Sequence, residues 1–240
     1  MSYLLKKEKN LEFFLFHNLN PKNLIYGFTT KIWSLKEIIR NFNLEENSVI
    51  TLRQIHSNKS HIITNKPKKL LVGDALITQK KGLLLTIRTA DCLPILFYEN
   101  EKNIIGAIHS GWKGTLKRIT FKVLKETINL FNLNPSSLII FLGPCICKKC
   151  YEVGEDVKRA FEIQKEWKNL NFLTYSNENK KYKLNLRKAN LIQIYEAGIR
   201  YENIFSIDLC TKCNPDLFYS HRRNPKSRGR MLAFIGLKNY

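Results

Sequence analysis

Short apolar runs separated by polar or turn-forming residues recur through most of the chain. The runs are rich in β-branched and aromatic residues, and Gly, Asn, Lys or Pro separates one from the next. This pattern is typical of β-strands, because such side chains pack well on a pleated, half-buried surface. We expect strands at residues 23–30, 48–56, 74–79, 83–89, 93–99, 103–109, 137–143, 182–186, 203–209 and 231–237.

A longer period marks the helices. One apolar stripe, with steps of three and four residues, consists of Leu116, Ile119, Val123, Thr127 and Phe131. It predicts an amphipathic helix that begins just after Gly114 and ends near Asn134 and Pro135. Weaker helical patterns cover residues 154–167 and 186–199. Because strands outnumber helices and do not alternate strictly with them, we predict an α+β fold of layered mixed β-sheets flanked by helices.

A chain of 240 residues can bury a sizeable core, and it shows no internal repeat or long low-complexity linker. We therefore expect a single domain over residues 1–240. The N-terminal residues lack the pattern of a secretory signal, and no apolar run approaches the roughly 18 residues of a membrane span. We expect a cytoplasmic protein without a membrane partner. We also expect a monomer, since a pocket within one layered domain needs no second copy.

The chain is strongly basic, with 40 Lys and Arg against 20 Asp and Glu and a formal charge of +20. Clustered basic residues attract polyanions. Here the lysines are spread along the chain and do not alternate with stacking aromatic residues. Lys, Asn and Ile are abundant while Ala and Gly are scarce, as AT-rich codons would produce regardless of function. We therefore do not expect a nucleic-acid partner.

Three predicted strands end on side chains that can carry chemistry: His56 in RQIHS, Cys92 in TADC and His109 in AIHSGWKG. Functional side chains often lie at the ends of rigid sheet elements. One thiolate and two imidazoles suit Zn²⁺ and leave a fourth position open for water or substrate. The spacing leaves alternatives open. The same residues fit a metal-free cysteine hydrolase, in which a histidine activates the thiol, or ordinary buried side chains.

Six cysteines in a chain without an export signal favour reduced thiols, metal ligands or a catalytic thiol over disulfides. Cys147-x-x-Cys150 and Cys210-x-x-Cys213 have the spacing of the two halves of a four-thiolate zinc site. The halves lie farther apart in sequence than in compact zinc ribbons. We therefore expect reduced, partly buried thiols here and keep a second metal as the alternative.

Eight segments, in their order and rough spacing, resemble the laccase-domain or YfiH-like family. They are RQIHS, GDALIT, TADCLPILFYE, GAIHSGWKG, GPCICKKCYEVG, KLNLRKANLIQ, DLCTKCNPDLFYSHRR and GRMLAFIGL. The resemblance covers nearly everything after about Asn23, and TADC followed by HSGWKG is a specific pair. Members are described as purine nucleoside phosphorylases that also deaminate adenosine. The resemblance implies phosphate as one substrate and adenosine, inosine, guanosine or S-methyl-5'-thioadenosine as the other.

The resemblance also implies a ligand set. The family binds metal through the His of Q-x-H, the Cys of TADC and the His of H-x-GW-[RK]-G, which fall here on His56, Cys92 and His109. It implies that these three residues are the catalytic zinc ligands, although Cu²⁺ can displace zinc in vitro by affinity. The segment NPKSRGR departs from the Asp-Gly-containing stretch of many relatives, which leaves the roles of Lys226, Ser227 and Arg228 open.

Phosphorolysis needs a phosphate site, and arginine offers the planar fork that matches phosphate oxygens. We name Arg53, Arg222 and Arg223 as substrate-binding candidates, with Arg88 beside them; each could also be a solvated surface residue. Asp74 in GDALIT is a further substrate-binding candidate, either through a ribose hydroxyl or by orienting an imidazole.

Three more residues beside the motifs have an ordinary and a functional interpretation. Asp91 precedes Cys92, and because neighbours on an extended strand point to opposite faces we expect it to be structural. Trp112 and Tyr151 could stack on a purine, although core packing is the commoner role of such rings.

Copper-dependent phenol oxidation fits poorly, because one cysteine and two histidines do not assemble several copper centres.

Overall fold

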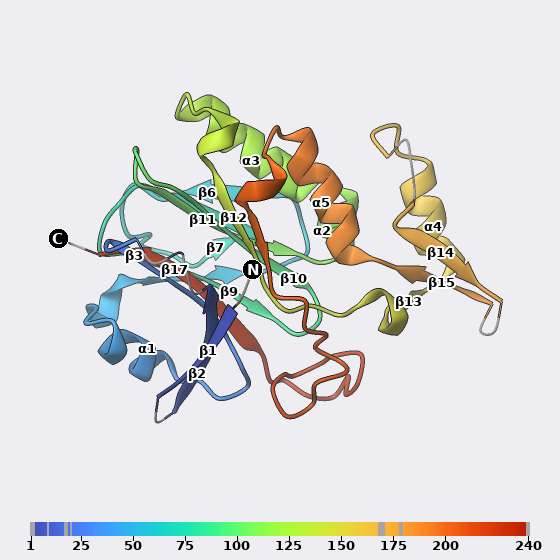
Figure 1. The fold of residues 1–240 in the computed structure, drawn as a ribbon, viewed down its shortest axis with the longest axis horizontal. Helices are drawn as coiled ribbons and strands as arrows, with labels where there is room; N and C mark the ends of the chain where they lie inside the picture. Colours follow the sequence, from blue (N-terminus) through green and yellow to red (C-terminus); the bar gives the residue numbers. More distant parts are fainter. Residues whose placement is uncertain are drawn as a thin grey trace.

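The computed structural model describes residues 3–8, 10–16, 19, 21–167, 171–177 and 180–238. In this part of the chain two large β-sheets face each other, and helices cover the outer face of one of them (Figure 1). The predicted α+β class, with layered mixed sheets flanked by helices, is confirmed. Among these residues, none of the helices combines the length and apolar character that a membrane span requires.

The first sheet is mostly antiparallel. Its strands are β1 (Tyr3–Glu8), β2 (Leu11–Phe16), β3 (Leu24–Thr29), β4 (Val49–Ile50), β9 (Leu84–Thr89) and β17 (Met231–Leu237). Their spatial order is β1-β2-β3-β17-β9-β4, and only β4 and β9 are parallel neighbours within the described residues. The first two strands lie outside the predicted set.

The second sheet carries two of the three predicted site residues: Cys92 directly precedes one of its strands, and His109 lies near the end of another. Its strands are β6 (Ser60–Ile62), β8 (Ala75–Thr78), β10 (Leu93–Glu99), β11 (Ile104–Ser110), β12 (Ile139–Leu142) and β16 (Ile204–Ser206). Their spatial order is β16-β12-β10-β11-β8-β6. The outer pairs β12–β16 and β6–β8 are parallel, and the pairs between them are antiparallel.

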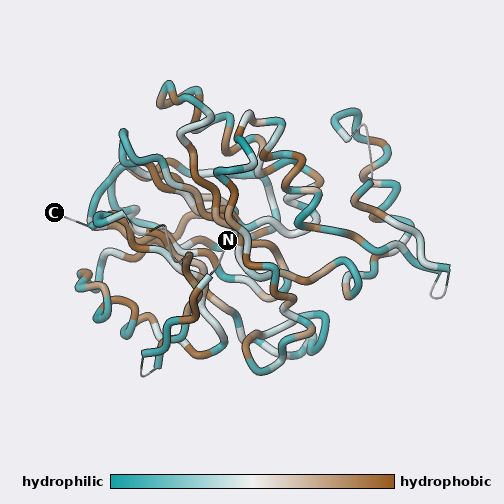
Figure 2. The backbone as a smooth tube through the Cα atoms, in the orientation of Figure 1, coloured by the Kyte–Doolittle hydropathy of each residue, from teal (hydrophilic) through white to brown (hydrophobic). Residues whose placement is uncertain are grey.

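The core strand β10 is buried on both faces, which explains its continuous apolar sequence. Leu96 and Tyr98 pack into the core between the two sheets. Ile95 and Phe97, one residue out of phase, pack into the core between the second sheet and the helices. Figure 2 shows hydrophobic segments gathered along these central strands, with hydrophilic chain in the outer loops. The chain therefore forms three layers, sheet on sheet on helices.

Four of the five described helices follow the predicted patterns, with one break, and the first was not predicted. They are α1 (Leu35–Asn41), α2 (Trp112–Leu116), α3 (Ile119–Leu130), α4 (Glu155–Glu162) and α5 (Leu186–Glu196). Short 3-10 turns occupy Glu46–Ser48, Pro135–Ser137, Lys148–Cys150 and Tyr201–Asn203. The single helix predicted after Gly114 is divided into α2 and α3, because Arg118 adopts a left-handed φ of 57° and interrupts the helical hydrogen bonds.

A smaller unit extends from one side of the layers (Figure 1). It consists of a sheet in the order β13-β15-β14 and the helix α4, packed around an apolar cluster that also includes Ala189 of α5. The strands are β13 (Glu152–Val153), β14 (Leu173–Ser176) and β15 (Lys181–Leu184). The strands β5 (Leu52–Arg53) and β7 (Leu71–Val72) form a separate two-stranded parallel sheet. The single domain over residues 1–240 stays a prediction.

Candidate functional site

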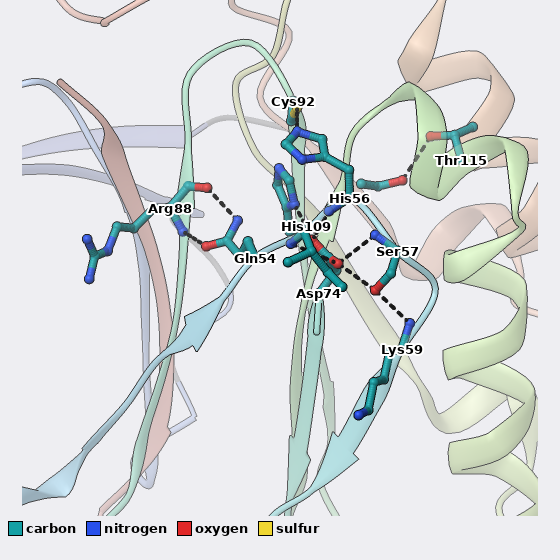
Figure 3. Close-up of polar contacts among 11 residues, drawn as sticks. Gln54, His56, Ser57, Lys59, Asp74, Arg88, Cys92, His109 and Thr115 are labelled. Carbon is teal, nitrogen blue, oxygen red and sulfur yellow. Dashed lines mark hydrogen bonds and ion pairs between the residues drawn. The ribbon is translucent and has the colours of Figure 1, made fainter. Parts of the chain in front are cut away.

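The three predicted site residues meet at one end of the central strands β10 and β11. The strand predicted to end on His56 ends at Arg53, and His56 lies in the loop after it. The ligand atoms of His56, Cys92 and His109 lie within 4.8 Å of one another. Cys92 Sγ is 3.8 Å from His56 Nε2, and the two imidazole rings meet edge to face with centroids 4.8 Å apart (Figure 3). This gathering makes the trio a candidate metal centre.

Strand register explains why these residues meet. β10 and β11 pair so that Leu93 faces Ser110 and Pro94 faces His109, which places Cys92 directly beside the end of β11. β8 pairs with β11 so that Ala75 faces Ile108, and the His109 N–H donates to the Asp74 carbonyl at 2.8 Å. The site is therefore a product of long-range pairing and not of local spacing.

Asp74 holds His109 and the backbone of His56 and Ser57 in place by hydrogen bonds. Its side chain is fully buried, and Oδ1 accepts from His109 Nδ1 at 2.8 Å and from the His56 N–H at 3.0 Å. Oδ2 accepts from the Ser57 N–H at 2.6 Å and the Ser57 hydroxyl at 2.7 Å (Figure 3). Burial alone would raise the pKa of Asp74, but the hydrogen bonds from His109 and Ser57 lower it to about 2. Because the ionised carboxylate only accepts, His109 carries its proton on Nδ1 and turns Nε2 toward Cys92.

Asp91 fixes the turn that presents Cys92. It lies between β9 and β10 with a left-handed φ of 87°. Its carboxylate accepts from the Thr211 hydroxyl at 2.6 Å, the Ser220 hydroxyl at 3.0 Å and the Arg222 N–H at 2.7 Å. A left-handed backbone at a non-glycine residue costs about 1–3 kcal/mol and persists only where surrounding contacts fix it. Asp91 is structural, as expected, but as the anchor of a turn and not as an outward residue of a strand.

The charges at the site favour a thiolate. Burial alone would raise the pKa of Cys92, but the positive charge of His109 and hydrogen bonds from His109 and His56 lower it to about 6. Burial alone would lower the pKa of His109, but the Cys92 thiolate and the Asp74 carboxylate raise it well above its usual range. Without a metal, Cys92 and His109 form a thiolate–imidazolium pair near neutral pH.

The donor set fits a zinc ion. Tetrahedral zinc, with bonds of about 2.3 Å to sulfur and about 2.1 Å to nitrogen, separates the two atoms by about 3.6 Å. The 3.8 Å between Cys92 Sγ and His56 Nε2 is close to that value. Gly111 leaves the space open, because a Cβ there would lie 2.8 Å from Cys92 Sγ and 2.9 Å from His56 Cδ2. His56, Cys92 and His109 are thus the residues that would hold the ion.

Two cavities flank the trio. The arginine cavity, about 660 Å³ in volume, is named for Arg53, Arg88, Arg228 and Arg230 in its lining. The aromatic cavity, about 370 Å³, is named for Trp112 and Tyr151. The residues that line both are His56, Ala90, Cys92 and His221. A ligand that spans the two cavities would therefore pass directly over the metal-binding atoms.

The structure separates the arginine candidates. Arg53 and Arg88 line the arginine cavity, and Arg222 lines the aromatic cavity with its guanidinium 5.1 Å from the centre of the Tyr151 ring. Arg223 lines neither of them. Its guanidinium donates to the carbonyls of Thr211, Lys212 and Phe218. It braces the loop that carries Arg222.

Sequence reasoning did not single out three of the residues that line these cavities. Arg230 and His221 contribute to the arginine cavity, and Gln54 joins them. Gln54 also exchanges hydrogen bonds of 2.8 and 2.9 Å with the backbone of Arg88, which ties β5 to β9 (Figure 3). The run RGR was a usable signal, because two closely spaced arginines directly before a buried strand place two permanent positive charges at a strand end. Arg228, whose role the sequence left open, also lines this cavity.

Residues 33–238 match the sequence profile of the family described as multi-copper polyphenol oxidoreductase laccase. The chain belongs to this family. A member from Bacillus subtilis named purine nucleoside phosphorylase YlmD is 30% identical over 92% of this chain and 91% of its own. A member from an unknown prokaryote, named adenosine deaminase RL5, is 32% identical over 77% of this chain and 72% of its own. The predicted resemblance is therefore confirmed.

A solved structure of the family shares this fold. The crystal structure of the Bacillus licheniformis hypothetical protein YfiH superposes with a TM-score of 0.88 at 26% identity and covers 98% of this chain and 99% of its own. The laccase description of the family and the His and Cys groups of this chain together point to a bound metal.

Proposed function

We propose that this chain is a zinc-dependent purine nucleoside phosphorylase that also deaminates adenosine. One observation carries the proposal: the donor atoms of His56, Cys92 and His109 converge where the arginine cavity meets the aromatic cavity. That arrangement offers an anion site and a site for a flat ring on either side of one metal centre. The names of the phosphorylase and deaminase relatives support the same activity.

Zinc held by the trio would supply a Lewis acid for an oxygen atom of phosphate or water. The chain's own residues supply the rest. Asp74 keeps His109 in one tautomer and, through the His56 N–H, fixes the loop that carries the second imidazole. The Asp91 turn holds Cys92 at the shared boundary of the cavities.

The arginine cavity would bind phosphate. Arg53, Arg88, Arg228 and Arg230 offer planar, permanently charged donors that match phosphate oxygens. In phosphorolysis a phosphate oxygen forms a bond to ribose C1' as the bond from C1' to purine N9 breaks. The electron pair leaves with the purine, which takes up a proton. Holding the anion in line with C1' is the main contribution of these arginines.

The aromatic cavity would hold the purine. Trp112 and Tyr151 present flat rings at its wall, and burial raises the pKa of Tyr151, so its phenol stays a neutral hydrogen-bond donor. His221 lines both cavities and is placed to pass a proton to the departing purine. In deamination water would add at purine C6 and ammonia would leave. The purine would occupy the same aromatic cavity in both reactions.

A metal-free cysteine hydrolase is a second candidate, because Cys92, His109 and Asp74 also form a thiolate, imidazole and carboxylate series. Copper-dependent phenol oxidation is less favoured. Over the described ranges, the groups of possible ligands include just one with histidine, the trio itself, whereas a laccase needs several copper centres.

Elemental analysis and turnover on the same samples test the proposal. Untagged protein and its Cys92→Ala and His56→Ala variants would be assayed with inosine and adenosine, with and without phosphate. We expect each variant to lose one equivalent of zinc relative to the wild type, together with release of hypoxanthine and ribose 1-phosphate. Cys145→Ala, a buried cysteine outside the trio, serves as the control and should keep both. Activity that persists without metal and disappears on alkylation of Cys92 would favour the hydrolase instead.

A further inference from the structure

The fold brings together the four cysteines that are paired at a distance in sequence. The sulfur atoms of Cys147, Cys150, Cys210 and Cys213 lie within 4.8 Å of one another. The two segments meet through a parallel β-bridge between Cys145 and Cys210, and the Thr211 N–H donates to the Cys145 carbonyl at 3.2 Å. The expectation of reduced thiols without a metal rested on the distance between the halves in sequence, and this bridge brings the halves together in space.

A hydrogen-bonded turn holds each pair of cysteines. In the first, the Cys150 N–H donates to the Cys147 carbonyl at 3.0 Å. In the second, Asn214 donates to the Cys210 carbonyl through its N–H at 3.2 Å and through its side-chain amide at 2.8 Å. Across the pairs, the Cys147 N–H donates to Cys210 Sγ at 3.3 Å. Such N–H to sulfur contacts favour a sulfur that carries negative charge.

We propose that these four cysteines bind a structural zinc ion in a closed four-thiolate site, separate from the trio at His56, Cys92 and His109. A tetrahedral ion with bonds of about 2.3 Å to sulfur holds its ligands about 3.8 Å apart. The cluster spans that value, with Cys150 Sγ and Cys213 Sγ 3.3 Å apart and all four sulfurs within 4.8 Å. Four thiolates leave no open position for substrate, so the ion's role is to hold the chain.

The site joins two segments that frame the aromatic cavity. Cys150 is followed by Tyr151, which lines that cavity. Cys210 is followed by Thr211, whose hydroxyl donates to Asp91 at 2.6 Å. Binding zinc only in the folded state stabilises this junction, because the unfolded chain does not gather the four thiolates.

Zinc content in a Cys92→Ala background tests the proposal, because that substitution removes a ligand of the trio. We expect about one zinc per chain to remain in Cys92→Ala. Adding Cys150→Ser and Cys213→Ser should remove it and lower the melting temperature, whereas adding Cys145→Ala should not remove it. With cobalt in place of zinc, the Cys92→Ala protein should show the strong sulfur-to-metal charge-transfer absorption of several thiolates, and the triple variant should not.

Wild-type protein gives a second readout that does not depend on the folding of variants. Maleimide labelling followed by peptide mass spectrometry should show the four cysteines protected until a chelator and denaturant are added. Rapid labelling of all four in the wild-type protein as purified, before any chelator or denaturant is added, would overturn the proposal. So would a mass lower by two hydrogens, which indicates a disulfide between Cys150 and Cys213, or copper in place of zinc.

Discussion

Asp74→Asn is the substitution that tests the organisation of the site most directly. Either orientation of the amide turns its NH₂ group toward donors: toward the Ser57 N–H, 2.6 Å from Oδ2, or toward His109 Nδ1 and the His56 N–H, 2.8 and 3.0 Å from Oδ1. The variant loses at least one hydrogen bond to a charged acceptor, worth about 1.5–3 kcal/mol, and leaves a buried donor unpaired, at a cost of about 1–3 kcal/mol. We expect the free energy of unfolding to fall by about 3–5 kcal/mol, as when one partner of a buried ion pair is removed.

The same substitution should weaken zinc binding at the trio by about 10–100-fold, because His109 loses the charged acceptor that fixes its tautomer. Urea unfolding of the metal-free proteins measures the first effect, and competition with a chromogenic chelator measures the second. Asp216→Asn, at an exposed carboxylate, is the matched control and should change neither quantity. If Asp74→Asn unfolds within about 0.5 kcal/mol of the wild type, the range of ordinary surface substitutions, and holds zinc equally well, Asp74 does not organise the site.

Three further predictions follow from the geometry and charges. In metal-free protein, iodoacetamide should label Cys92 at a rate that is high above pH 6 and falls as the pH drops through about 6, because its pKa is lowered to that value; Cys145, whose pKa is raised by burial, should stay unreactive at pH 7. Gly111→Ala should weaken zinc binding in a chelator competition, since the new Cβ would lie 2.8 Å from Cys92 Sγ; unchanged affinity would show that the space is not needed. Arg53→Ala should raise the KM for phosphate several-fold with little change in the KM for inosine, whereas Arg223→Lys should lower the melting temperature and leave the KM for phosphate unchanged. Equal effects of the two substitutions on KM would contradict the separate roles.

The local pattern of apolar and polar residues was enough to predict most strands and the α+β class, because a strand buried on one or both faces has a recognisable apolar pattern. It was not enough where backbone pairing alone holds a polar segment in a strand. The strand β1 is mostly exposed and, among the described residues, pairs with β2 alone, so its lysines carry no strand signal. The break at Arg118 was missed for a similar reason. The apolar stripe continues across it, while the backbone turns through a left-handed residue.

The site shows the same limit more sharply. The sequence placed His56, Cys92 and His109 at strand ends, but their meeting depends on the registers that set Pro94 against His109 and Ala75 against Ile108. Register is a long-range property, so the trio could be named in advance only through the resemblance to a family. The four-cysteine cluster lacked even that guide. A single bridge between Cys145 and Cys210 decides whether its halves meet.

Two buried carboxylates perform parallel tasks on either side of Cys92. Asp74 binds the backbone of His56, which has a left-handed φ of 57°, and Asp91 is itself left-handed at 87°. Each strained residue costs about 1–3 kcal/mol, and the hydrogen bonds to these carboxylates are what maintain it. The protein therefore gives up some folding free energy to hold the ligand atoms of His56 and Cys92 in place without a metal. The donor geometry of the proposed metal site therefore exists before an ion binds, which is the preorganisation that a functional site needs.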